Sequence, residues 1–267
     1  MSESEIEIDE FGFGRDPNII ESGTDELSLP PVVNLLVLLK AGREDHMNAL
    51  RDGKLFCRRL SYYSEFEGDP APHQDAHEGL ACVYQSDRIK VTFTPADGGK
   101  PIALSARNGL VGPVFVSVRH ENPVFCLHAV HTGDWTHRTF GDDELAAFKA
   151  SLQVPASMDK FGSHVWVITN GLEFNRRLRA ACAAQKIRCR GKLVRYVDPR
   201  RIHGTVPRGA RGFVKLDSFA EEREYRFSFE AARELGDPFV LDVGSLHDVS
   251  EVTTLAAFRS GWSIDFE

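Results

Sequence analysis

Short apolar runs separated by turn residues dominate the hydrophobic pattern of this chain, and such runs are typical of strands. The first run, Val32 to Leu39, lies between two prolines and Gly42 and predicts a strand that is buried on both faces. The segments 88–93 and 101–105 predict a hairpin around Asp97-Gly98-Gly99. The remaining predicted strands are 54–60, 114–118, 123–130, 164–169, 192–197, 213–216, 222–229 and 239–243.

Helical periodicity is clearest in 171–185, where Phe174, Leu178 and Cys182 recur on one face and the arginines lie mainly off it. The other predicted helices are 43–51, 142–152 and 249–258. Strands and helices do not alternate regularly along the chain. The sequence therefore predicts an α+β fold with a mixed, largely antiparallel sheet and flanking helices.

Polar segments complete the predicted organisation. Residues 1–29 are acidic and poor in aliphatic clusters, which predicts a disordered leader, and 30–267 are predicted to form a single α+β domain. The segments 61–80 and 203–212 are rich in turn residues and predict loops. The loop at 61–80 is long for a compact domain, and long loops often carry function.

Charge is distributed unevenly around a net value of −7. Residues 1–30 hold nine acidic groups and only one basic residue, whereas 171–215 hold thirteen Lys and Arg against two acidic residues. This asymmetry indicates a polyanion-binding surface, although a solvated helix face beside an acidic leader explains the same charges without a partner. The candidate nucleic-acid contacts are Arg176, Arg177, Arg179, Arg188, Arg190 and Lys192.

Several function classes are disfavoured by missing signals. No apolar run has the length of a membrane span, and the N-terminus lacks the pattern of a secretory signal. The five cysteines are odd in number and scattered, which predicts reduced thiols and a cytoplasmic location. The motifs of serine hydrolases, P-loop enzymes, zincins and Rossmann enzymes are missing, and Cys126, His128 and His131 match no zinc spacing, so no metal is expected.

The late strand 222–229 carries the most informative pattern. Alternation along a strand places Glu222, Glu224 and Arg226 on one face. Two carboxylates that point the same way repel, which suits a site that orients a hydroxyl or stabilises a developing cation. Arg226 offsets this repulsion or holds a phosphate. The alternative is a solvated edge, where Glu and Arg neutralise each other across neighbouring strands.

The polar loop at 61–80 supplies a second constellation. Tyr62 and Tyr63 suit stacking on a base or a nicotinamide ring. Ordinary turn chemistry, with aromatic residues covering the core, explains the same residues. A further alternative is a nuclease in which Asp75 and Glu78 join the two late glutamates to hold a divalent metal.

The order of several short motifs resembles a broad group of uncharacterised bacterial proteins that often sit among mobile and phage-defence genes. The resemblance spans roughly residues 32–245. Its motifs are Gly53-Lys54-Leu55-Phe56, Asp75-Ala76-His77-Glu78-Gly79, Phe161-Gly162-Ser163-His164, Glu173-Phe174-Asn175-Arg176-Arg177-Leu178, and Lys215 followed by Glu222-Arg223-Glu224-Tyr225-Arg226.

The chain is also similar to ADP-ribosyltransferases, whose late strand often carries Glu-x-Glu, here Glu222-x-Glu224. This resemblance implies a small mixed-sheet fold, NAD as substrate, Glu224 as the catalytic carboxylate and Glu222 as the residue that orients the acceptor. The family's early strand grips NAD with Arg or His, and this sequence departs from that pattern because only Lys40 ends the first strand. The family's second strand supplies a Ser, Thr or Tyr, and the candidate for it here is Ser61, Tyr62 or Tyr63. Arg226, as a candidate phosphate ligand on the late strand, completes the predicted cofactor contacts.

The leading hypothesis is therefore an ADP-ribosyltransferase-like effector, a toxin or an antiviral defence protein. It would modify a nucleic acid or a protein bound near 171–215, and a toxin of this kind implies an inhibitor or antitoxin partner. The first alternative is a non-enzymatic nucleic-acid-binding or sensor module with structural glutamates. The second is the metal-dependent nuclease.

Overall fold

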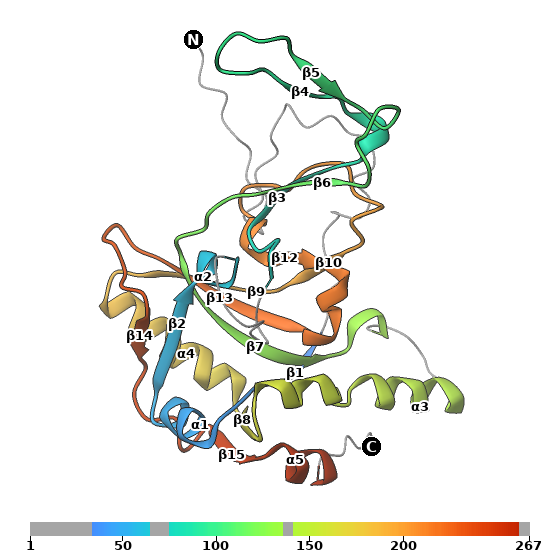
Figure 1. The fold of residues 1–267 in the computed structure, drawn as a ribbon. Coiled ribbons are helices and arrows are strands. Elements are labelled where there is room, and N and C mark those ends of the chain that lie inside the picture. The colour runs from blue at the N-terminus through green and yellow to red at the C-terminus, as the bar shows by residue number, and fades with distance from the viewer. Residues whose placement is uncertain (1–33, 65–74, 136–140, 262–267) are drawn as a thin grey trace, which may run out of the picture.

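The computed structural model describes residues 34–64, 75–135 and 141–261, and within them the chain has the predicted α+β class with mostly antiparallel sheets (Figure 1). The predicted leader, 1–29, lies outside the described residues, and the single domain over 30–267 stays a prediction. None of the helices in the described ranges combines the length and the apolar composition of a membrane span. The helices are α1 (Glu44–Arg51), α2 (Leu60–Ser64), α3 (Asp142–Ser151), α4 (Gly171–Ala184) and α5 (Leu255–Gly261).

The largest sheet has eight strands in the order β14-β2-β7-β1-β8-β15, with β13 paired to β7 and β9 paired to β13. These pairings are all antiparallel. Its strands are β1 (Leu35–Gly42), β2 (Lys54–Arg59), β7 (Pro123–His131), β8 (His164–Ile168), β9 (Arg188–Leu193), β13 (Glu224–Glu230), β14 (Phe239–Asp242) and β15 (Ser250–Thr254).

Smaller sheets pack beside β13 and β9. One contains β3 (Leu80–Tyr84), β6 (Val114–Ser117) and β11 (Gly204–Thr205), and another is the parallel pair β10 (Arg195–Val197) and β12 (Val214–Leu216). The predicted hairpin is confirmed as β4 (Val91–Phe93) and β5 (Ile102–Leu104), which project at one end of the molecule (Figure 1). Short 3-10 turns are η2 (Ser86–Arg88), η3 (Gly133–Trp135), η4 (Ala156–Phe161), η5 (Arg211–Phe213) and η6 (Asp217–Glu222).

The two faces of the large sheet bury different clusters. Helices α1 and α4 cover the first face, where Phe174 and Leu178 of α4 pack with Trp166 and Phe227. On the second face, α3, η4 and α5 pack over β1 and β8 and enclose a second hydrophobic cluster. The smaller sheets enclose a third hydrophobic cluster. Alternation along β13 sends Phe227 toward α4 and the neighbouring Arg226 toward the second face.

Several predicted boundaries differ from the structure. The segment 249–258, predicted as a helix, forms β15 and then α5, because its β-branched residues pair with β8. The predicted strand 222–229 begins only at Glu224, since Glu222 ends η6 and Arg223 adopts a left-handed φ of 42°. The strand predicted at 32–39 is not buried on both faces where it begins, because Leu35 and Leu36 are each 42% exposed.

Other differences concern strands that were missed. The predictions contain no strand at β3, whose residues follow the long polar loop. The short strand β11 lies within 203–212, a segment that was predicted to be a loop. The strand predicted at 192–197 is two strands, β9 and β10, which pair with different neighbours.

Candidate functional site

A gap in the large sheet creates the candidate site. One edge of β7 pairs with β13, whereas its other edge pairs with β1 from His128 onward and with β2 only at Val124 and Pro123. Among the described residues, 125–127 of β7 therefore have no strand partner in β1 or β2. The Nζ of Lys40, near the end of β1, donates a hydrogen bond of 2.7 Å to the main-chain oxygen of Cys126 at this point.

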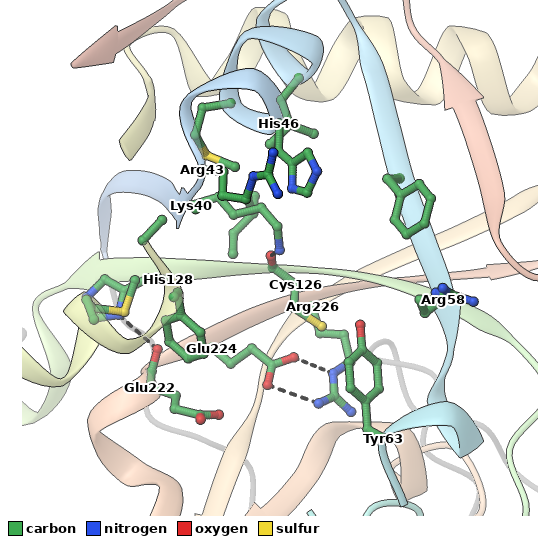
Figure 2. Close-up of a pocket in the computed structure, with 18 of the residues that line it drawn as sticks. Lys40, Arg43, His46, Arg58, Tyr63, Cys126, His128, Glu222, Glu224 and Arg226 are labelled. Atoms are coloured by element: carbon green, nitrogen blue, oxygen red, sulfur yellow. Dashed lines mark hydrogen bonds and ion pairs between the residues drawn. The ribbon is translucent and has the colours of Figure 1, made fainter. Parts of the chain in front are cut away.

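A cavity of about 640 Å³ occupies this gap. Lys40, Arg43 and His46 lie on one side of β7, and Glu224, Arg226 and Tyr63 lie on the other (Figure 2). Helix α1 crosses between β1 and β2 and closes the first side. The cavity thus connects the two faces of the sheet. Further lining residues are Met47, Leu50, Lys54, Phe56, Arg58, Tyr62, Glu78, Cys126, His128, Met158, Phe161, Lys215, Glu222 and Val240.

The close approach of η4 to β1 depends on a glycine. Gly162, which follows η4, has a φ of 144°, and a Cβ at this position would lie 2.3 Å from the main chain of Gly42. Only glycine permits this contact. The contact lets η4 pack closely on the end of β1, and Met158 and Phe161 of η4 line the cavity beside it.

The floor of the cavity is a buried network of charges centred on Arg226. Its Nε and one terminal nitrogen donate to the two oxygens of Glu224 at 2.5 and 3.0 Å, and its guanidinium also donates to both oxygens of Glu78 at 2.9 and 3.1 Å. A further bond reaches the main-chain oxygen of Gly212. Arg226 is 1% exposed, so these partners replace its hydration.

Lys215 of β12 is the second cation of this network. Its Nζ lies 2.9 Å from Glu222, 3.4 Å from Glu224 and 3.8 Å from Glu78. Glu222, which is more exposed, also accepts a bond of 3.2 Å from Lys160 of η4. Three carboxylates therefore surround two buried cations, and a third cation lies at the rim.

These contacts fix the ionisation of the floor. Burial alone would raise the pKa of Glu224, but the charges of Arg226 and Lys215 outweigh it and hold this pKa well below its ordinary value. Burial raises the pKa of Glu78 in spite of the same two cations. The carboxylates oppose the effect of burial on Lys215 and hold its pKa above the ordinary lysine value. Glu224 is therefore an anion at neutral pH.

Aromatic side chains and a guanidinium form the wall on the β2 side. The guanidinium carbon of Arg58 lies 4.4 Å from the ring centre of Tyr62 and 5.4 Å from that of Phe56. Tyr62 and Tyr63 meet edge to face with ring centres 5.6 Å apart. Phe56 remains 49% exposed, so this wall offers stacking surface to a planar group.

His128 of β7 lines the cavity beside Glu224, its register partner on β13. Its Nδ1 lies 2.9 Å from the main-chain oxygen of Glu222 (Figure 2). Because a carbonyl oxygen only accepts, Nδ1 carries the hydrogen and Nε2 does not. Burial, and to a lesser degree the charges of Arg223 and His131, lower the pKa of His128 to about 4 although the bond to Glu222 opposes them.

The structure brings together six of the seven residues predicted for catalysis and NAD binding. Lys40, Tyr62, Tyr63, Glu222, Glu224 and Arg226 all line the cavity.

Two of the predicted roles need correction. Ser61 is buried, is not part of the cavity lining, and lies in α2, where its main-chain nitrogen donates to the oxygen of His120. Arg226 takes the first of its two predicted roles, because it offsets the repulsion of the carboxylates, and the two glutamates and Gly212 engage the donors that the second role, holding a phosphate, would need. Glu222 reaches the cavity from the turn η6 rather than from the strand.

Several lining residues were not predicted as site residues, namely Phe56, Arg58, His128 and Lys215. Phe56 and Arg58 lie on one strand, β2, shortly before the predicted tyrosines. Phe56 and Lys215 lie in motifs of the resemblance, but the sequence singles out His128 only as a candidate zinc ligand. His128 and Lys215 reach the cavity through long-range strand pairing.

The six predicted nucleic-acid contacts are divided between the two faces of the sheet. Arg176 and Arg177 of α4 pair with Glu173, and Arg177 also pairs with Asp248, whereas Arg179 bonds Asn175. The pairing of β9 with β13 places Lys192 opposite Arg226, Arg190 opposite Ser228 and Arg188 opposite Glu230, on the second face. These six residues therefore do not form one continuous surface.

A divalent metal site gains no geometric support. Among the described residues no group of three His, Cys, Asp or Glu side chains is arranged to hold a metal ion. Lys215 and Arg226 occupy the space between Glu78, Glu222 and Glu224. Asp75, the remaining residue of the nuclease hypothesis, is not part of the cavity lining.

Comparison with protein-family models, curated proteins and solved structures finds no match to this chain. The cavity and its chemistry are therefore the basis for any functional statement.

Proposed function

We propose that this protein is an ADP-ribosyltransferase-like enzyme that cleaves NAD and transfers ADP-ribose to an acceptor. The observation that carries the proposal is the convergence of Lys40, Tyr62, Tyr63 and Glu224 on one cavity, from separate parts of the chain. The volume of about 640 Å³ lies within the range of small-molecule sites, roughly 300–1,000 Å³.

The residues present fit the chemical parts of NAD. Lys40 offers positive charge to a diphosphate, and so do Arg43, which also pairs with Asp45, and Arg58, which lies 3.7 Å from Asp237. The wall of Phe56 and the tyrosines offers stacking to a planar ring. Glu224, held as an anion at the floor, suits the positive charge that develops on the ribose as the bond to nicotinamide breaks. Its fixed position means that little reorganisation accompanies this charge development.

The test is the release of nicotinamide from NAD by the purified chain, compared with Glu224→Gln. We expect the variant to lose about 100-fold in rate, because it removes a charge aimed at the transition state. Glu230→Gln, at the far end of the same strand and outside the cavity, is the matched control and should retain the wild-type rate. Equal rates for wild type and Glu224→Gln would refute the proposal.

A ligand-binding or sensor module without turnover is the second candidate. It is favoured by the engagement of both Glu224 oxygens by Arg226, which leaves the carboxylate tied to a structural partner. Calorimetry with NAD separates the two candidates. Saturable binding without nicotinamide release would support the module, and release that depends on Glu224 would support the enzyme.

A further inference from the structure

Strand β9 lies at an edge of the large sheet and carries a row of cations. Among the described strands of this sheet, its partner is β13 alone. The register with β13 places Arg188, Arg190 and Lys192 on the second face, two residues apart, and Arg188 and Arg190 are exposed. Side chains two residues apart on a strand are separated by about 7 Å. This separation is close to that of successive phosphates along one strand of a nucleic acid.

A further cation, Arg211 of η5, lies near this row. Its Nε donates to the main-chain oxygen of Val206 at 3.2 Å, and its two terminal nitrogens have no bond to another described residue. Burial, and after it the charges of Arg226, Arg190 and Arg211, hold the pKa of His120 below its ordinary value. Arg190 and Arg211 therefore lie near the same imidazole, although they belong to separate elements.

Acidic groups are scarce in this part of the chain. Residues 186–213 hold nine Lys and Arg against Asp198 alone, and Asp198 pairs with Arg200. Arg190 forms no ion pair with another described residue. Arg188 lies 3.8 Å from Glu230, and its side chain is 81% exposed. The positive charge of β9 and η5 is therefore largely uncompensated and open to solvent.

The arginines of α4 are in the opposite situation. Arg176 and Arg177 both pair with Glu173, and Arg177 also pairs with Asp248. A polyanion on α4 would have to displace these carboxylates, whereas on β9 it would meet unpaired guanidinium groups. An acidic protein would also meet this charge, but the regular two-residue repeat along one strand favours a chain of evenly spaced phosphates.

We propose that Arg188, Arg190 and Arg211 bind the sugar-phosphate backbone of a nucleic acid on the second face of the sheet. Contacts of this kind position the nucleic acid without reading its bases, so binding depends little on sequence. Lys192 continues the row, and its register partner is Arg226 of the cavity floor, so the bound strand passes beside the cavity. The surface does not depend on NAD cleavage.

The experiment measures binding without NAD. Fluorescein-labelled single-stranded DNA and RNA of about 16 nucleotides are titrated with the full chain between about 50 and 200 mM salt, and anisotropy is recorded. We expect saturable binding that weakens as salt rises. Arg190→Gln and Arg211→Gln should each weaken it about tenfold at the lowest salt, and each should lower the salt slope by about 1, because each removes one phosphate contact.

Matched variants separate the loss of a contact from a loss of charge or of fold. Arg176→Gln removes the same charge from α4 and should keep the wild-type affinity and salt slope. Arg190→Lys keeps the charge on β9 and should bind within about threefold of the wild type. The double variant Arg190→Glu, Arg211→Glu should abolish binding, because it places two negative charges beside the phosphates.

The outcomes decide the proposal. A wild-type chain that binds neither oligonucleotide at the lowest salt would overturn it, and so would equal weakening by Arg176→Gln and Arg190→Gln. A poly-glutamate peptide that competes as well as an oligonucleotide of equal charge would assign the surface to an acidic protein instead. A chain that binds the oligonucleotides and leaves NAD intact would lose the proposed function and keep this surface.

Discussion

Helix α4 and strand β13 carry similar mixtures of Glu and Arg, but the structure uses them in opposite ways. On α4, Arg176 and Arg177 pair with Glu173 at the surface, and their hydrogen bonds lower the pKa of Glu173 to about 2. On β13, Arg226 and Glu224 are buried and line a cavity. The same residue types therefore give a solvated helix face in one place and a candidate reaction site in the other.

The two clusters differ in whether a charged group can be hydrated again once its partner is removed. An exposed arginine that loses its carboxylate regains water, whereas a buried carboxylate that loses its arginine does not. The two clusters should therefore respond very differently to single substitutions, and this contrast can be measured.

The largest expected effect is on Arg226. Arg226→Gln leaves Glu78 and Glu224 buried with only Lys215 as a cation, and we expect the free energy of unfolding to fall by about 3–5 kcal/mol. Denaturant unfolding of the wild type and the variant at neutral pH measures this difference in the free energy of unfolding. Adding Glu78→Gln should recover part of the loss, and a decrease below about 1 kcal/mol for Arg226→Gln would contradict the buried network.

A smaller effect is expected from pH, through His128. Its pKa is about 4 in the folded chain and about 6.5 when unfolded, so the unfolded chain binds more protons between these values. Stability should be complete above about pH 6.5 and fall by roughly 3 kcal/mol as the pH drops to 4. Unfolding curves across this range, for wild type and His128→Asn, should differ in slope. Parallel curves would show that His128 does not titrate in this way.

The smallest effect is expected on α4. Arg176→Gln removes an exposed ion pair with Glu173, and the unfolding midpoint should stay within the error of the wild-type value. Thermal unfolding at low and high salt checks this expectation. A clear loss of stability would mean that the surface arginines contribute to the fold as the buried one does.

The sequence predicted the alternation along β13 correctly from Glu224 onward, because strand periodicity is a local property. It could not predict that Arg223 would turn the chain and leave Glu222 on η6. The lone pair of His128 and the position of Lys215 depend on register with distant strands, which no local pattern encodes. The long loop predicted as functional lies partly outside the described residues, at 65–74.

The helix predicted at 249–258 is instructive in the same way. Its strand half contains Val252, Thr253 and Thr254, whose branched side chains favour a sheet, and β8 supplies the partner. The apolar spacing alone did not separate the strand from the helix that follows it.

The unequal attachment of the cavity walls has a mechanical consequence. Among the described strands, β2 pairs with β7 at Arg58 and Arg59 only, and the residues that follow β2 add two main-chain bonds just before β7, whereas β1 is paired along both of its edges. A ligand larger than the empty cavity would therefore displace β2 rather than β1, because fewer main-chain hydrogen bonds resist that movement. The aromatic wall on β2 would then move outward to admit the ligand, while the β1 wall keeps its position.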